Sequence, residues 1–307
     1  MSELQQQLVD AVDILKADGL IGMPTETVYG LAGNAASAKA VAAIYALKNR
    51  PTFNPLIAHV ASLEMAQREA VFSETALSLA DAFWPGPMTL VLPVASQNTV
   101  CDLARAGLDT QALRWPEHPI AQGLISSFGG PLVAPSANKS GRISPTRQKH
   151  VLEEFGADLK LVLDGGQSVL GLESTVLFVD DDKVTQLRAG SLAREAIEAL
   201  VGPISSALDD DEAPRSPGML SRHYAPEARL RLNVDQPESG EAYLGFGDCR
   251  SAPTLNLSEA GSLSEAASNL YDMLRRLDQR FDKIAVAPIP ETGIGQAIND
   301  RLRRASL

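Results

Sequence analysis

The sequence predicts a two-domain α/β protein, with a larger domain followed by a smaller one. The chain has 307 residues, more than a single domain usually contains. Short apolar runs alternate with stretches of helical periodicity, which is typical of α/β domains. After Gly202 the composition changes to a stretch rich in Asp, Pro, Ser and Ala, which indicates a linker before a second domain.

The N-terminal part of the larger domain is expected to alternate between helices and strands. Apolar residues at helical spacing predict a helix over 4–15, which Gly19 stops, and the run at 20–23 predicts a buried strand. A second helix is expected over 37–47. Because Pro51 cannot continue that helix, the polar residues just before it lie at or beyond the C-terminal end.

The rest of the larger domain follows the same alternation. Short apolar runs between turn signals predict strands at 56–60, 88–94, 132–134, 159–163, 174–179 and 184–188. Helical periodicity predicts helices at 77–83, 120–128 and 193–201. The first of these helices is expected to stop at Trp84, because Pro85 follows it. We therefore expect the larger domain to cover residues 1–204.

The C-terminal third is expected to consist of a linker over 205–227 and a small α/β domain over 228–307. In that domain, apolar runs and helical periodicity predict strands at 229–232, 242–246 and 284–287 and helices at 263–277 and 294–302.

The composition excludes several classes of protein. The formal charge of −11 argues against broad, nonspecific nucleic-acid binding, which requires neutralisation of phosphates, but it permits a local basic pocket. Cys101 and Cys249 stand far apart, so neither a disulfide framework nor a thiolate metal site is indicated. The N-terminus lacks the features of a signal peptide, and no apolar run reaches membrane-spanning length. We expect a cytoplasmic protein without membrane partners.

Two pairs of polar residues suggest a phosphate site. Lys48 and Arg50 end the second helix, and Ser136 and Asn138 follow the strand at 132–134. Phosphate oxygens are bound by cations and hydrogen-bond donors, and ligand crevices of α/β sheets open at strand ends. Each pair also has a structural explanation, since cations commonly cap helix C-termini and Ser and Asn are common in turns.

The two common nucleotide-binding motifs are absent. The sequence has neither Gly-x-x-x-x-Gly-Lys-Ser/Thr nor Gly-x-Gly-x-x-Gly after a strand, and residues 293–295 (GIG) are better explained as a tight turn. His118, His150 and the cysteines show no metal-ligand spacing, so no direct metal site is expected. Any nucleotide would therefore bind by another scheme.

Several motifs resemble those of the threonylcarbamoyl-AMP synthases that are built on the YrdC domain. They stand in the family's order at 24–31 (PTETVYGL), 48–51 (KNRP), 54–57 (NPLI), 84–89 (WPGPMT), 134–138 (APSAN) and 173–176 (ESTV). The motifs at 216–219 (SPGM) and 223–226 (HYAP) resemble those of the longer, two-domain branch of this family. Between them, 220–222 (LSR) departs from the tyrosine-containing stretch that this branch often has.

The resemblance implies a fold and a reaction. The fold is a YrdC-like twisted mixed sheet with flanking helices, followed by a small Rossmann-like α/β domain. The reaction makes threonylcarbamoyl-AMP and pyrophosphate from L-threonine, bicarbonate and ATP, with Mg²⁺ as the expected metal. The product would pass to the tRNA threonylcarbamoyltransferase machinery, which modifies the adenosine next to the anticodon, and direct tRNA binding is not expected. Such chemistry requires positioning and charge neutralisation rather than a covalent nucleophile.

The resemblance also implies which residues form the site. The catalytic residues would be Lys48, Arg50, Ser136 and Asn138. Contacts to ATP would come from the same four residues and from Asn54, Thr110, Ser144 and Arg188. The threonine pocket would consist of Thr27, His59, Arg114, Ala134 and Ser174. Here the planar guanidinium of Arg114 suits a carboxylate, whereas His59 is also explained as a core histidine of an apolar strand.

Two carboxylates and two linker residues have open interpretations. Glu26 and Glu173 could orient the cations or bind Mg²⁺ through water, and structural hydrogen bonding explains them equally well. His223 and Tyr224 suggest that the linker folds over the pocket as a lid, which would retain the intermediate and exclude water. A docked tether between the domains is the alternative.

Two other functions remain compatible with the YrdC-like motifs. A carbamoyl-transfer enzyme of the hydrogenase-maturation type would carry acylphosphatase and zinc-finger modules, which this sequence lacks. A non-catalytic RNA-binding module would present a basic face with interleaved aromatic residues, whereas this chain is acidic and 5% aromatic.

Overall fold

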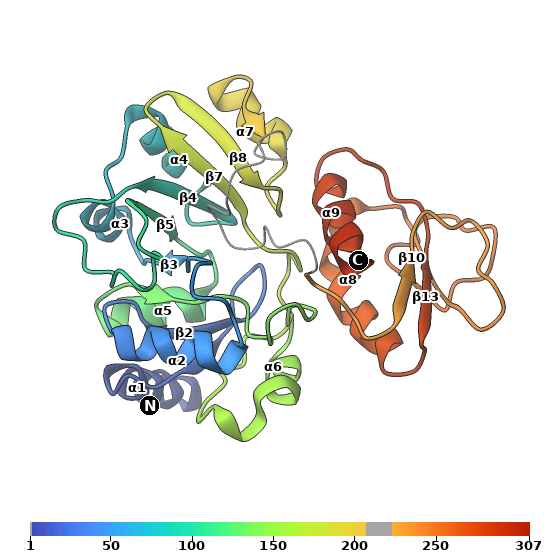
Figure 1. Cartoon of the computed structure of the whole chain (residues 1–307), viewed down its shortest axis with the longest axis horizontal. Coiled ribbons are helices and arrows are strands. Elements are labelled where there is room, and N and C mark those ends of the chain that lie inside the picture. The colour runs from blue at the N-terminus through green and yellow to red at the C-terminus, as the bar shows by residue number, and fades with distance from the viewer. Residues whose placement is uncertain (1, 207–222) are drawn as a thin grey trace.

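The computed structural model describes residues 2–206 and 223–307. These residues form a larger sheet and a smaller sheet, each with helices packed against it (Figure 1). The predicted fold class, a mixed α/β sheet followed by a small C-terminal α/β domain, is thereby confirmed. The motif at 216–219 and the departure at 220–222 lie outside the described residues.

The larger sheet is mixed. Its strands are β1 (Ile21–Met23), β2 (Gly30–Asn34), β3 (Ala58–His59), β4 (Met88–Pro93), β5 (Thr110–Arg114), β6 (Leu132–Val133), β7 (Thr175–Asp180), β8 (Lys183–Arg188) and β9 (Ser205–Ser206). Their order in the sheet is β1-β2-β6-β3-β5-β4-β7-β8-β9. The pairs β3/β5, β4/β7 and β8/β9 are parallel, and the other neighbours are antiparallel.

The helices of the larger domain follow from ordinary start and stop signals. They are α1 (Glu3–Lys16), α2 (Ala38–Lys48), α3 (Leu63–Glu69), α4 (Glu74–Phe83), α5 (Pro119–Phe128), α6 (Gln148–Phe155), the 3₁₀ turn η1 (Gly156–Asp158) and α7 (Arg194–Val201). Ser2 and Gln5 form a capping box at the start of α1, each side chain accepting from the other's backbone N–H. As predicted, α4 ends just before Trp84 and Pro85.

The alternation of side chains along the strands gives the sheet two different faces. Leu90 and Leu113 point into the main core, which the helices cover. Val91 and Ala112, the neighbouring residues, belong to a small separate cluster on the other face. That second face carries fewer apolar side chains, so it is available for a site.

The structure corrects several predicted elements. The expected strand at 159–163 does not form, because among the described residues only Gly22 pairs with this segment, through hydrogen bonds to Leu161 and Leu163. β2 is absent from the sequence prediction because it contains two glycines, which strands rarely favour. At Gly33 the packing is tight, since a Cβ would lie 2.9 Å from the end of the Leu20 side chain. The prediction also lacks α3, α6, β5 and β9.

The smaller sheet is parallel. Its strands are β10 (Arg229–Arg231), β11 (Ala242–Gly245), β12 (Leu255–Asn256) and β13 (Lys283–Val286), in the order β10-β13-β11-β12. Two helices, α8 (Leu263–Asp278) and α9 (Gly295–Ala305), lie on the side of this domain that faces the larger one (Figure 1). Val28, Ile143 and Leu172 of the larger domain pack into the apolar cluster that these helices form.

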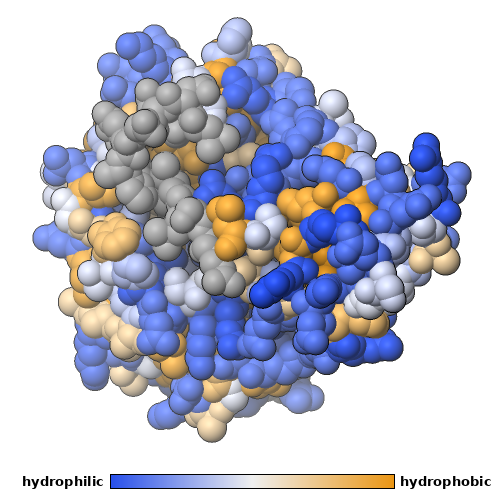
Figure 2. Space-filling model, turned by 45° about the vertical axis from the view of Figure 1, so that its right-hand side comes forward, coloured by the Kyte–Doolittle hydropathy of each residue, from blue (hydrophilic) through white to orange (hydrophobic). Residues whose placement is uncertain are grey.

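Hydrophilic residues predominate on the face drawn in Figure 2, and apolar residues form only small patches there. Across residues 2–206 and 223–307, no helix combines the length and the apolar character needed to cross a bilayer.

Candidate active site

A pocket opens on the second face of the larger sheet, beside β3, β5 and β7. It brings together Thr27, Arg50, His59, Arg114, Ala134, Ser136, Ser174, Arg188, His223 and Tyr224, all of them predicted site residues. Val28, Ile57, Pro135 and Glu173 complete the lining. The predicted threonine residues and several predicted ATP residues therefore share one cavity.

Strand register explains why two of these residues meet. β3 and β5 are parallel, and His59 pairs directly with Arg114. Both side chains point to the second face, as do Ile57 and Ala112 two residues earlier on the same strands. His59 is 2% exposed, and burial together with the charge of Arg114 lowers the pKa of His59 to about 3. The imidazole is therefore neutral, and its Nδ1 has no hydrogen-bond partner among the described residues.

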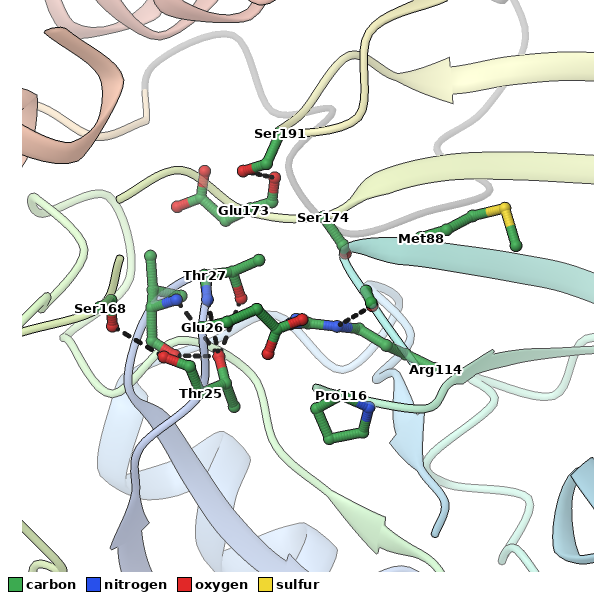
Figure 3. Close-up of polar contacts among 12 residues, drawn as sticks. Thr25, Glu26, Thr27, Met88, Arg114, Pro116, Ser168, Glu173, Ser174 and Ser191 are labelled. Atoms are coloured by element: carbon green, nitrogen blue, oxygen red, sulfur yellow. Dashed lines mark hydrogen bonds and ion pairs between the residues drawn. The ribbon is translucent and has the colours of Figure 1, made fainter. Parts of the chain in front are cut away.

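Arg114 forms a buried ion pair at the floor of the pocket. Its Nη2 donates to Oε1 of Glu26 at 2.6 Å, and each side chain is 5% exposed. Figure 3 shows the guanidinium of Arg114 beside the Glu26 carboxylate. Oε2 of Glu26 has no partner within the described part of the chain. Structural hydrogen bonding, one of the two roles left open for Glu26, thus accounts for one of its oxygens only.

Hydroxyl groups line the same region from two loops. Thr25 and Thr27 share a hydrogen bond of 2.8 Å between their Oγ1 atoms, and Thr25 also donates to the Val28 carbonyl, which fixes the turn before β2 (Figure 3). On the other side, Ser174 and Thr89 share a hydrogen bond of 2.7 Å between their hydroxyls. A small polar substrate would meet hydroxyls on both sides of the pocket.

Besides Arg114, two further arginines, Arg50 and Arg188, supply positive charge to the pocket. Arg50 donates to the carbonyls of Asn54 and Pro55 at 3.2 and 3.0 Å, so the loop after α2 holds its guanidinium in place. Arg188 donates from Nε and Nη2 to the Ser174 carbonyl at 3.1 and 2.8 Å. Burial lowers the pKa of Arg50 to about 10, and both guanidiniums remain charged at neutral pH.

Lys48 lies behind the pocket and not in its lining. Its Nζ donates to the carbonyls of Ser136 and Asn138, both at 2.5 Å, and the side chain is 1% exposed. Burial, reinforced by the charge of Arg50, lowers the pKa of Lys48 well below its usual value. In this structure Lys48 therefore holds the backbone of the 134–138 motif, whereas the sequence prediction gave it a direct contact to phosphate.

Four other predicted ATP residues also lie outside the lining. Asn138 donates from Nδ2 to the carbonyls of Lys139 and Arg142, which organises its own loop. Ser144 donates to Glu173 at 2.6 Å. Asn54 is a buried residue of the loop that Arg50 braces, and Thr110 begins β5 at the end opposite Arg114. Four residues of strand span about 13 Å, which separates Thr110 from the pocket floor.

His223 and Tyr224 cover the pocket from the linker side. Their rings lie 4.1 Å apart in an edge-to-face arrangement, and Tyr224 has a left-handed backbone, with φ of 62°. The free space enclosed is about 50 Å³, whereas ligand pockets usually measure about 300–1,000 Å³. His223 and Tyr224 are two of the residues that bound this small space.

Two residues of the small domain contact Glu173, a residue of the pocket lining, and are absent from the sequence prediction. Arg301 of α9 donates to Oε2 of Glu173 at 2.9 Å, and Tyr271 of α8 lies 3.0 Å from the same oxygen. A signal for Arg301 does exist in the sequence. It falls beside Leu302 and three residues after Ile298, on the face of α9 that is otherwise apolar and buried.

Comparison with known proteins assigns both parts of the chain. A family model described as "Telomere recombination" matches residues 13–190, and one described as "Threonylcarbamoyl-AMP synthase, C-terminal domain" matches residues 192–306. The Bacillus subtilis threonylcarbamoyl-AMP synthase is 38% identical, over 100% of this chain and 94% of its own length. The chain belongs to the threonylcarbamoyl-AMP synthase family. The Schizosaccharomyces pombe threonylcarbamoyl-AMP synthase is 35% identical, covering 99% of this chain and 89% of its own.

A solved structure of this family supports the fold. The Pyrococcus abyssi protein, described as Sua5 complexed with L-threonine, superposes with a TM-score of 0.90 at 36% identity and covers 100% of this chain and 95% of its own. The match extends over both domains, as expected for a two-domain threonylcarbamoyl-AMP synthase. It therefore favours the synthase over the carbamoyl-transfer enzyme and the RNA-binding module.

The pocket of this threonylcarbamoyl-AMP synthase does not fit a directly bound metal ion. The described residues contain no group of three or more His, Cys, Asp or Glu side chains placed to hold one. Glu173 is fully engaged by Arg301, Tyr271 and Ser144. Glu26 keeps one oxygen that lacks a partner among the described residues, and a single oxygen does not make a magnesium site.

Proposed function

We propose that the pocket performs the synthase reaction in the cytoplasm. L-threonine, bicarbonate and ATP give threonylcarbamoyl-AMP, pyrophosphate and water, and the product passes to the tRNA threonylcarbamoyltransferase machinery. One observation carries this proposal: three buried arginines, Arg50, Arg114 and Arg188, line one cavity. Guanidinium groups suit carboxylate and phosphate oxygens, so such a cavity could hold an amino acid next to a triphosphate. The substrates named here are those of the family to which the chain belongs.

We place threonine at the floor of the pocket, beside Arg114. Arg114 binds the α-carboxylate through its planar fork, and Glu26 keeps that fork oriented. Thr27 and Ser174 contact the substrate hydroxyl or the carbamate, and His59 and Ala134 shape the walls. Because His59 is neutral, it accepts or donates a hydrogen bond without competing for the carboxylate.

The phosphate end is assigned to the basic residues and the 134–138 loop. Arg50, Arg188 and Ser136 contact the triphosphate, and Lys48 and Asn138 act by holding the loop that presents Ser136. The remaining predicted ATP residues are Asn54, Ser144 and Thr110, which do not line the pocket. Neutralisation of the triphosphate charge is the main contribution of such residues to phosphoryl chemistry.

The chemistry then proceeds in two bond-forming steps. The threonine amine attacks the bicarbonate carbon, and loss of water leaves a carbamate. A carbamate oxygen attacks the α-phosphate of ATP, the bond from that phosphorus to the bridging oxygen breaks, and pyrophosphate leaves. Magnesium is proposed to arrive on the triphosphate, since the described part of the pocket offers it no direct ligand set.

The linker is proposed to act as a lid. His223 is 6% exposed and Tyr224 is 2% exposed, and both line the cavity that ATP must enter. Closure over the bound intermediate would exclude water and slow its hydrolysis. The docked tether is the competing interpretation, and it predicts that removal of these two side chains leaves the intermediate bound.

The proposed function is tested by pyrophosphate release from ATP with bicarbonate and single amino acids. Threonine-dependent release, absent without bicarbonate, is the expected result. Release that no amino acid stimulates would contradict the proposal and would favour a binding module. Arg114→Ala is the matched control, because it should abolish the threonine dependence while leaving the phosphate-binding arginines in place.

A further inference from the structure

The small domain contacts the wall of the pocket through two buried side chains, Arg301 and Tyr271. Arg301 is 1% exposed, and Tyr271 is fully buried. Nε of Arg301 donates to Oε2 of Glu173 at 2.9 Å, and the Tyr271 hydroxyl lies 3.0 and 3.2 Å from the two oxygens of the same carboxylate. The remaining nitrogens of Arg301 bind the Ala189 carbonyl at 2.8 Å and Asp300 at 2.6 Å. This guanidinium is therefore held on every side.

The same two residues hold the linker side of the pocket. The Arg301 guanidinium lies 5.0 Å from the centre of the Tyr224 ring, a cation–π distance. Tyr271 stacks on Tyr224 at 5.9 Å with 22° between the rings. Arg301 and Tyr271 therefore each contact both Glu173 and Tyr224.

We infer that Arg301 is a positioning residue for the reaction, and that it acts from the small domain by fixing the Glu173 carboxylate and the Tyr224 ring in the pocket. The inference rests on the proposed function. It assigns the small domain a part in the substrate site, because Arg301 of α9 contacts two residues that line the pocket, Glu173 and Tyr224.

The position of Glu173 matters because its neighbour contacts substrate. Ser174 follows it directly, and the Ser174 carbonyl accepts two hydrogen bonds from Arg188, whose Nη2 also lies 3.1 Å from the Ser174 hydroxyl. Release of the Glu173 carboxylate would let this segment shift. Both Ser174 and Arg188 would then move relative to the rest of the pocket.

The charge of Glu173 depends on the same contact. Burial favours the neutral acid, but the guanidiniums of Arg301 and Arg188 and a hydrogen bond from Ser144 hold the pKa of Glu173 at about 2. The charged and titratable groups that face this carboxylate are Arg301 and the neighbouring Asp300 of α9, Tyr271 of α8, Arg188 of β8, and His223 and Tyr224 of the linker. Loss of Arg301 removes the largest influence that lowers the pKa of Glu173, so we expect this pKa to rise.

The test compares Arg301→Ala and Arg301→Lys with the wild type. Pyrophosphate release is measured between about pH 5.5 and pH 8.5, with kcat and the KM values of threonine and ATP determined separately. We expect Arg301→Ala to lower kcat/KM roughly tenfold or more and to add an acid limb to the pH profile. Arg301→Lys restores a positive charge, so it should recover the wild-type pH profile but only part of the rate.

A second pair of variants tests the contact without reference to turnover. Glu173→Gln combined with Arg301→Ala removes the uncompensated buried charge. The double variant should therefore have a higher Tm than Arg301→Ala alone. If Arg301→Ala does not fold, Tyr271→Phe carries the kinetic test, since it removes one donor to Glu173 and keeps the ring that stacks on Tyr224. Its expected loss of kcat/KM is roughly threefold.

Asp272→Asn is the matched control. Asp272 lies on α8 at another part of the interdomain contact, 3.2 Å from Arg147 and 3.3 Å from His150, and its ion pairs within the described chain do not include Glu173 or Arg301. It should weaken docking without changing the pH profile. An Arg301→Ala variant with wild-type kinetics, or an Asp272→Asn variant with the same acid limb, would overturn the inference alone. A wild type without threonine-dependent pyrophosphate release would overturn the proposed function and this inference together.

Discussion

Nη2 of Arg114 donates to Oε1 of Glu26 at 2.6 Å, in a pocket where each side chain is 5% exposed. Arg114 lines the pocket, and Glu26 contacts it from outside the lining. A planar guanidinium has enough donors to keep Glu26 and still present two N–H groups to a second carboxylate. We therefore expect the pair to orient Arg114 and to leave donors of its guanidinium available for the carboxylate of threonine.

Arg114→Lys should raise the KM of threonine roughly tenfold or more, because an ammonium cannot bind Glu26 and a substrate carboxylate in one plane. The KM of ATP should change little. Pyrophosphate release at varied threonine measures both values. Arg105→Lys, a substitution at an arginine that pairs with Asp102 away from the pocket, serves as the control. An unchanged KM of threonine would show that Arg114 does not bind the amino acid.

Lys48→Met should destabilise the protein by about 2–4 kcal/mol, because two carbonyls lose a buried donor. Turnover should also fall, since Ser136 loses its support. Denaturant unfolding and pyrophosphate release measure the two effects. Lys39→Met, on the exposed side of the same helix, should change stability by less than about 0.5 kcal/mol. If Lys48→Met is as stable as the wild type, Lys48 has no structural role, and a direct contact to phosphate would be favoured instead.

Stability should fall as the pH drops from about 6.5 towards 3. The pKa values of His59 and His223 are lowered from 6.5 to about 3, chiefly by burial. Between these pH values the unfolded chain binds protons that the folded chain does not. Each histidine therefore lowers the free energy of unfolding by about 1.4 kcal/mol for each unit by which the pH falls. His59→Gln should flatten the dependence of the unfolding free energy between about pH 6.5 and pH 5. An equally steep dependence in His59→Gln would contradict the buried neutral state.

His223 and Tyr224 replaced together by alanine should speed the release or hydrolysis of threonylcarbamoyl-AMP roughly threefold or more, because the pocket would open to water. Pyrophosphate release in the first turnover should persist. The fraction of intermediate that stays bound after gel filtration measures retention. If retention and turnover match those of the wild type, the linker is a tether and not a lid.

Several residues singled out from the sequence line one pocket in the structure. Arg114 ends β5 and Ser174 directly precedes β7, whereas Thr27 lies in the loop between β1 and β2. The role of a side chain that binds backbone carbonyls is harder to predict from the sequence. Lys48 points to carbonyls of the 134–138 motif, and no local pattern distinguishes such a lysine from one that binds phosphate.

The contribution of the small domain could not be predicted from local sequence patterns. Glu173 and Arg301 lie 128 positions apart, and their pairing depends on how α9 docks against the larger domain. A buried cation on an apolar helix face indicates that a partner exists, but it does not identify the partner. For the same reason, the strand predicted at 159–163 was wrong, because only tertiary packing decides that a single described residue, Gly22, pairs with it.

The most direct test of the proposed reaction supplies isotopically labelled bicarbonate, threonine and ATP to the wild type and identifies the products by mass spectrometry. We predict an adenylate that contains both threonine and the labelled carbon, formed in equal amount with pyrophosphate. Pyrophosphate without such an adenylate, or an adenylate that lacks the label, would contradict the assignment of this pocket.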